Sequence, residues 1–268
     1  MEINGTFYSL QRPSSFQRWT SETPSDFVFA VKGGRFITHM KKLVGVETAL
    51  ANFFASGVLA LGAKLGPFVW QLPPMMKLNE GAYDSAHYES FFRPLPHTVH
   101  AAVRLAKRCA ERILTRAFLK PTLKRGEDPQ LRHAIEIRHD SFVQPASIEL
   151  LKKHHIGWVM ADTVEWPLLM DVTSQFAYLR LHGSERLYLS GYDADAIEVW
   201  AHCVVSFATG NPAEGRYAGT SVQDGRARDV YVYFDNDAEG RAPVDAQALV
   251  RRVEDLLRGQ SAIASATV

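Results

Sequence analysis

The sequence predicts a TIM-type (β/α) barrel, and three observations support that prediction. Short apolar runs alternate along the chain with segments of helical period, which is the pattern of repeated βα units. These runs are nearly continuously apolar, as expected for parallel strands that are covered on both faces. The chain has 268 residues, and one barrel of this type takes about 250 residues. We therefore expect a single barrel domain over residues 1–268.

Seven apolar runs are candidate strands, one fewer than a complete barrel of this type has. They are residues 1–4, 27–32, 68–72, 133–138, 158–161, 176–181 and 230–234. Helical periodicity and end signals predict helices at residues 14–21, 46–62, 98–115, 145–155, 193–208 and 244–258. The strand count predicts a barrel that lacks its usual first strand and helix.

Composition excludes several classes of protein. Because 30 Lys and Arg balance 29 Asp and Glu, charge gives no argument for binding nucleic acid or an acidic membrane. The two cysteines, Cys109 and Cys203, lie in expected helices without metal-ligand or redox spacing, so we expect inert thiols. The most apolar window, residues 57–76, is interrupted by Lys64 and by prolines, and no leader-like stretch opens the chain. We expect a cytoplasmic protein with no membrane partner.

Polar side chains lie at the ends of the apolar runs, where parallel strands of a barrel present groups to one mouth. Side chains alternate along a strand, so Glu136 and Arg138 share one face, as do Arg180 and His182. A buried charge without a partner costs several kcal/mol. These side chains therefore need either one another, as structural ion pairs, or a ligand.

Three of these residues are candidate catalytic groups, namely Glu136, Asp162 and His182. His182 can transfer a proton near neutral pH or bind a metal ion. Asp162 closes the preceding strand, where its carboxylate can act as a general base, orient His182 or cap the next segment. The sequence leaves these three roles of Asp162 open.

Nine further residues are candidate substrate-binding groups. Arginine and lysine suit an anionic group, amides suit hydroxyls, and rings in loops can stack on a sugar. The candidates are Asn4, Tyr8, Lys32, His39, Gln71, Arg138, Arg180, Tyr192 and Asn236. Together they predict a polar mouth for a small polar or phosphorylated molecule.

Seven blocks of the chain carry a resemblance to a known family. They are EINGTFY at residues 2–8, FVFAVK at 27–32 with ITH at 37–39, LGP at 65–67 with QLPP at 71–74, EIRH at 136–139, ADT at 161–163, YLRLHG at 178–183 and YVYFDN at 231–236. In this order they resemble the family catalogued as domain of unknown function 72, the YecE-like proteins. The resemblance implies a TIM-type barrel, of a kind described as related to sugar isomerases, whose biochemical role is not established. Members usually open with a Gly-Thr-Ser-Gly-Trp-like strand and a helix that this sequence lacks, so we expect an N-terminally shortened barrel.

A divalent metal ion is an open possibility for the cofactor. Glu136, Asp162, His182 and an acid within residues 235–237 stand in an order that looks like the metal ligands of sugar isomerases and epimerases. Such ligands would suit Mn²⁺, Mg²⁺ or Zn²⁺. Arg138 and Arg180 share faces with two of them and would repel a cation. We therefore assign no metal ligand and keep a metal-free pocket as the simpler interpretation.

Three functional hypotheses remain. The first is an enzyme that moves protons on a small polyhydroxylated or phosphorylated substrate, as sugar isomerases and epimerases do. The second is a hydrolase or phosphodiesterase acting on sugar phosphates or nucleotides. The third is a non-catalytic ligand-binding or scaffold barrel. The strand edge left by a missing first strand would also favour self-association.

Overall fold

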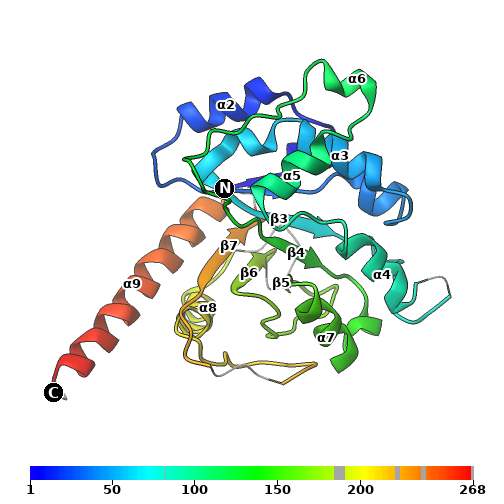
Figure 1. Ribbon diagram of the computed structural model, residues 1–268. Coiled ribbons are helices and arrows are strands. Elements are labelled where there is room, and N and C mark those ends of the chain that lie inside the picture. Colours follow the sequence, from blue (N-terminus) through cyan, green and yellow to red (C-terminus); the bar gives the residue numbers. More distant parts are fainter. Residues whose placement is uncertain (82, 184–190, 221–223, 237–239, 267–268) are drawn as a thin grey trace. The chain divides into compact units, whose positions relative to one another are not determined.

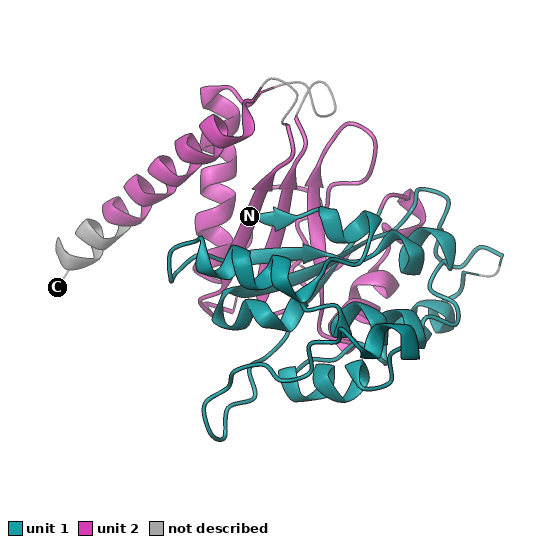
Figure 2. Ribbon diagram, turned by 90° about the horizontal axis from the view of Figure 1, so that it is seen from above, with its two compact units in different colours: residues 1–137 teal, residues 138–268 magenta. Residues whose placement is uncertain are grey.

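The computed structural model of the protein describes residues 1–81, 83–183, 191–220, 224–236 and 240–266 (Figure 1). The chain divides into two compact units, Met1–Ile137 and Arg138–Val268 (Figure 2). Each unit contains a parallel sheet in which the strand order follows the chain order. The two units are described separately below.

Unit 1 contains a four-stranded parallel sheet: β1 (Glu2–Ile3), β2 (Phe29–Lys32), β3 (Leu65–Gln71) and β4 (His133–Glu136). Its helices are α1 (Gly5–Tyr8), α2 (Pro13–Ser21), α3 (Glu47–Ala55), α4 (Ser85–Phe92), α5 (Val99–Ala106) and α6 (Glu111–Leu114). A π-helical turn, η1 (Phe36–Met40), and a 3-10 helix, η2 (Val58–Lys64), complete it. Buried aromatic rings, among them Phe53, Phe54 and Trp70, fill the space between α3 and the sheet.

The register of this sheet places the polar strand ends on one face. Lys32 pairs with Val69, and Gln71, two residues further along β3, pairs with Glu136. Paired residues in a sheet point to the same side, and residues two apart in a strand share a face. Lys32, Gln71 and Glu136 therefore project from the same face, and all three are buried.

Unit 2 contains the remaining strands, β5 (Ile156–Asp162), β6 (Phe176–Leu181) and β7 (Asp229–Phe234). Its helical elements are η3 (Asp140–Phe142), α7 (Pro145–Lys153), α8 (Ala194–Ala208) and α9 (Ala242–Ala266). Pro145 opens α7, where its missing N–H costs nothing. Asp193 caps α8 by accepting a 2.8 Å hydrogen bond from the backbone N–H of Ala196. These end signals were readable from the sequence.

The predicted strands are all present, while two predicted helices are divided. The expected helix at 46–62 ends after α3, because Gly57 has a left-handed φ of 118° and η2 begins beyond it. A side chain at Gly57 would also place its Cβ 2.5 Å from the Cα of Pro13. The expected helix at 98–115 is split into α5 and α6. The sequence analysis did not predict α1, η1, η3 or α4.

Within the described residues the seven strands, interspersed with helices, confirm the predicted TIM-type α/β class. Both cysteines are free thiols. Among the same residues, no helix is long and apolar enough to cross a membrane.

Candidate active site

The ends of β6 and β7 bring Arg180, His182 and Asp235 together. Arg180 pairs with Tyr233 in the register of the two strands, so His182 and Asp235 follow on the same face. Hydrogen bonds continue the ladder past the strand ends: the N–H of His182 donates to the Asp162 carbonyl at 3.1 Å, and that of Asp235 to the Leu181 carbonyl at 2.8 Å. The backbone therefore fixes where the side chains of His182 and Asp235 begin.

One carboxylate oxygen serves both basic side chains in this group. Asp235 Oδ2 accepts a hydrogen bond from Arg180 Nη2 at 2.8 Å and lies 3.3 Å from His182 Nδ1. The side chains of Arg180 and His182 are 1% and 0% exposed, whereas that of Asp235 is 27% exposed. We call these three residues the Arg–His–Asp cluster. It places a partly accessible carboxylate beside a buried guanidinium and a buried imidazole.

A stacked arginine lies close to this cluster. The guanidinium carbon of Arg138 is 4.0 Å from the centroid of the Trp166 ring, a cation–π contact. The Trp166 ring in turn meets the His182 ring edge-on, with centroids 6.4 Å apart. Sequence reasoning proposed Arg138 but missed Trp166, although this ring lies in the segment that follows β5, where a binding residue is expected.

The structure does not bring Asp162 to His182. Asp162 pairs with Leu181, so its side chain projects from the face opposite Arg180 and His182. Its Oδ2 accepts hydrogen bonds from the Tyr192 hydroxyl at 2.9 Å and the Trp200 indole N–H at 3.0 Å. Trp200 belongs to α8, so Asp162 ties the end of β5 to the helix that packs on this side.

Tyr192 and Asn236 belong to the same helix-side network. The Tyr192 hydroxyl also accepts the backbone N–H of Gly183 at 3.1 Å, and its backbone N–H donates to Asp245 Oδ2 at 3.1 Å. Asn236 Nδ2 donates to that same oxygen at 2.8 Å. Burial and the nearby Asp162 carboxylate raise the pKa of Tyr192, so its phenol keeps its proton. These two predicted hydroxyl-binding residues hold the backbone beside His182 and Asp235.

Three predicted residues of unit 1 gather around a ring that the prediction did not include. Lys32 Nζ lies 4.8 Å from the centroid of Phe7, and the rings of Tyr8 and His39 each meet Phe7 edge-on at 5.1 Å. The buried Thr6 holds Phe7 next to Lys32. Its hydroxyl lies within hydrogen-bond distance of the Ile3 carbonyl, at 2.9 Å, and of the Lys32 carbonyl, at 2.6 Å, and so joins α1 to β1 and β2.

The other unit 1 candidates divide by exposure. Asn4 is exposed and stands immediately before α1, without a side-chain capping bond. Gln71 and Glu136 are 6% and 0% exposed and lie side by side in the β3–β4 register. Among the described residues, no group of three or more His, Cys, Asp or Glu side chains is placed to hold a metal ion.

The comparisons with known proteins identify the family. The family model described as "Protein of unknown function DUF72" matches residues 1–266. The chain belongs to this family. No curated protein matches it. Among solved structures, a DUF72 family protein of Thermotoga maritima MSB8 is 21% identical with a TM-score of 0.66, over 96% of this chain and 84% of that one.

A second DUF72 family protein, from Enterococcus faecalis V583, is 17% identical with a TM-score of 0.65, over 94% of this chain and 84% of that one. At these identities the likeness establishes a shared fold. A shared fold does not fix a function, which depends on the chemistry of the side chains of the DUF72 chain itself.

Proposed function

We propose that this DUF72 protein is an enzyme that moves a proton on a small polyhydroxylated substrate carrying a carboxylate or phosphate. The observation that supports the proposal is the sharing of Asp235 Oδ2 by Arg180 and His182 at 2.8 and 3.3 Å. A carboxylate on one imidazole nitrogen selects the tautomer and orients the ring, which is the usual arrangement of a histidine that acts as acid and base.

In this proposal the His182–Asp235 pair transfers the proton. In this arrangement Asp235 Oδ2, 3.3 Å from Nδ1, favours the tautomer of His182 that is protonated on Nδ1, which leaves Nε2 to take up and return a substrate proton. Arg180 donates to the same carboxylate and holds it in place. The partial exposure of Asp235 gives the pair contact with solvent, through which its proton can exchange.

Arg138 and Trp166 supply the binding half of the site. Stacking on Trp166 engages the flat face of the guanidinium, whereas hydrogen bonds to an anion are made in its plane. Arg138 is therefore suited to hold a carboxylate or phosphate beside His182. The indole also offers an apolar surface against which a sugar ring can stack.

The test is deuterium exchange catalysed in D₂O. A panel of aldose phosphates, ketose phosphates and uronic acids is incubated with the protein, and ¹H NMR follows the loss of the C–H signal next to the carbonyl. We expect exchange with at least one compound, loss of more than about a hundredfold in rate for His182→Gln, as is typical when an acid–base group is removed, and a similar loss for Asp235→Asn. Circular dichroism and thermal melting verify that each variant is folded at the assay temperature.

Arg138→Gln should raise the KM for anionic compounds and leave neutral sugars unaffected, while Arg251→Gln, an exposed position on α9, is the matched control. If the wild type exchanges no compound of the panel, or if His182→Gln and Asp235→Asn exchange at the wild-type rate, the proposal is wrong. Release of inorganic phosphate that is lost in the same variants would instead indicate hydrolysis at this site.

A further inference from the structure

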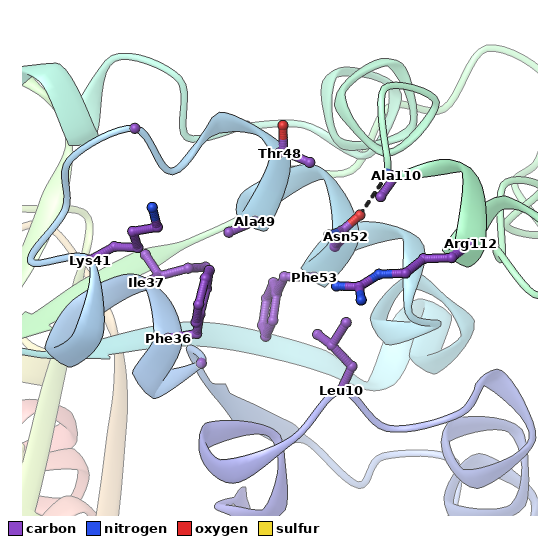
Figure 3. Close-up of a pocket in the computed structure, with 12 residues that line it drawn as sticks. Leu10, Phe36, Ile37, Lys41, Thr48, Ala49, Asn52, Phe53, Ala110 and Arg112 are labelled. Atoms are coloured by element: carbon purple, nitrogen blue, oxygen red, sulfur yellow. Dashed lines mark hydrogen bonds between the residues drawn. The ribbon is translucent and has the colours of Figure 1, made fainter.

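A pocket lies entirely within unit 1, and the proposed catalytic residues take no part in it. It is formed by η1, the segment that follows, α3 and the start of α6, and its volume is about 430 Å³ (Figure 3). Pockets that bind small molecules typically measure about 300–1,000 Å³. Leu10, Phe36, Ile37 and Phe53 make its surface largely apolar.

The charged groups of this pocket are both cations. Lys41 and Arg112 belong to the lining, which includes no Asp or Glu. Among the residues that the structure describes, neither side chain forms an ion pair with a carboxylate. In Figure 3 Arg112 reaches toward Phe53 from one side, and Lys41 lies on the other side, beyond Phe36. Two cations beside an apolar surface favour a ligand that combines an apolar body with negative charge.

An oriented amide adds a hydrogen-bond donor. Asn52 Oδ1 accepts the backbone N–H of Ala110 at 2.8 Å, which fixes the orientation of its carboxamide and makes Nδ2 the donor that remains (Figure 3). Asn52, Arg112 and Lys41 thus offer N–H groups from different elements. The pocket therefore combines aromatic rings with hydrogen-bond donors in its lining.

The rim of the pocket is built from uncommon backbone conformations. Phe36–Met40 is a π-helical turn, which in proteins often accompanies a functional site. Directly after it, Lys42 and Leu43 have left-handed φ values of 48° and 70°. Residues in this conformation are strained and persist only where the surroundings hold them. Here Leu43 is 1% exposed, so the core anchors the strained segment.

We propose that this pocket binds a small flat aromatic anion. The ring lies against Phe36 and Phe53, the anionic group pairs with Arg112, and Lys41 adds positive charge from the opposite side. A planar ring fits this surface because offset or edge-to-face contacts with two phenyl rings stabilise it beyond simple burial. The inference rests on unit 1 alone and does not depend on the proton-transfer proposal.

The experiment uses naphthalene-2-sulfonate as an aromatic anion and 2-naphthalenemethanol as its neutral counterpart. Binding of each to the full-length protein is measured by NMR titration. Arg112→Gln should weaken sulfonate binding at least about tenfold, as expected for losing a hydrogen bond to a charged group, and Lys41→Gln should weaken it less. Neither variant should change the affinity for the alcohol.

Two further variants locate the binding. Ala49→Phe places a ring in the pocket from a half-buried position of α3 and should abolish binding of both probes. Lys107→Gln removes an exposed cation of the same unit outside the pocket and should change nothing. The proposal is overturned if the sulfonate does not saturate the wild type, if Ala49→Phe binds it as the wild type does, or if the two charge variants leave its Kd unchanged.

Discussion

The indole N–H of Trp70 donates a 3.1 Å hydrogen bond to Nδ1 of His133, deep in unit 1. His133 Nε2 must then carry the ring proton, and it lies 2.8 Å from the Pro96 carbonyl, which accepts it. The ring is 0% exposed and stacks on Phe68 with centroids 5.3 Å apart. Both nitrogens of a neutral imidazole are thus satisfied, and a second proton would displace the Trp70 bond.

This relationship predicts a loss of stability in mild acid. Burial lowers the pKa of His133 to about 3, although the Pro96 bond opposes this shift. Between pH 6.5 and about 3 the unfolded chain binds a proton that the folded protein refuses, so the free energy of unfolding falls by about 1.4 kcal/mol per pH unit from this group. The contribution is fully present above pH 6.5, the ordinary value.

Urea titrations at pH 7.5 and pH 5 measure this slope. His133→Gln should be less stable at pH 7.5, because it loses the packed ring, but its stability should fall by about 2 kcal/mol less than that of the wild type between these two values. Equal losses in both proteins would show that other groups dominate this range of pH.

Gly33, which directly follows Lys32, should not tolerate a side chain. A Cβ at this position would lie 2.1 Å from Trp70 Cε3. Because Trp70 is fully buried and bonded to His133, it cannot move aside cheaply. We expect Gly33→Ala to lower the free energy of unfolding by about 1–3 kcal/mol. Gly34→Ala is the control, since its Cβ would come no closer than 3.7 Å to a neighbour, the backbone oxygen of Thr6. Equal destabilisation of both variants would contradict this steric explanation.

The strands and their polar ends were predictable because two local signals coincide. Buried parallel strands are nearly continuously apolar, and the first polar residue after such a run marks the strand end. This signal located Lys32, Glu136 and Arg180. It could not decide which side of the sheet each end faces. Asp162 and His182 were grouped by their place in the chain, whereas the register puts them on opposite faces.

The hydrogen-bond partners of the strand-end residues could not be predicted when they lie far away in the sequence. Trp200 of α8 and Asp245 of α9 complete the network of Tyr192 and Asn236, yet helix residues give no sign of which strand end they reach. The sequence analysis also missed the end of a helix where a left-handed backbone conformation causes it, as at Gly57 with its φ of 118°. The π-helical turn of η1 has no recognisable sequence period, so the pocket beside it could not be anticipated.

Tyr192→Phe should loosen the backbone that carries His182. The hydroxyl donates to Asp162 and accepts the N–H of Gly183, so its removal leaves the buried Gly183 amide without this acceptor and the half-buried Asp162 carboxylate with one donor fewer. We expect a loss of about 1–3 kcal/mol in the free energy of unfolding. Hydrogen exchange of the Gly183 amide should become faster. Tyr217→Phe, which removes a hydroxyl bonded to the Ala213 carbonyl, is the matched control and should leave Gly183 exchange unchanged.

The Arg180–Asp235 pair should be strongly coupled, unlike an ordinary surface salt bridge. Arg180 is 1% exposed, so removing Asp235 leaves a buried guanidinium without this carboxylate. We expect Asp235→Asn to cost about 3 kcal/mol, within the range for breaking buried pairs. Arg228 and Asp224 form another ion pair, at 2.5 Å, with a more exposed carboxylate. The loss in free energy of unfolding for Asp224→Asn is the internal comparison for that of Asp235→Asn.

A double-mutant cycle separates the pair from its surroundings. Arg180→Met combined with Asp235→Asn should be about 1–3 kcal/mol more stable than the sum of the single losses predicts, because the double variant buries no uncompensated charge. Additive losses would mean that Arg180 is held by other groups and that Asp235 is available to His182 alone. The cycle thereby also tests the basis of the proposed acid–base pair, because a coupled Arg180 is what holds the Asp235 carboxylate in place beside the imidazole.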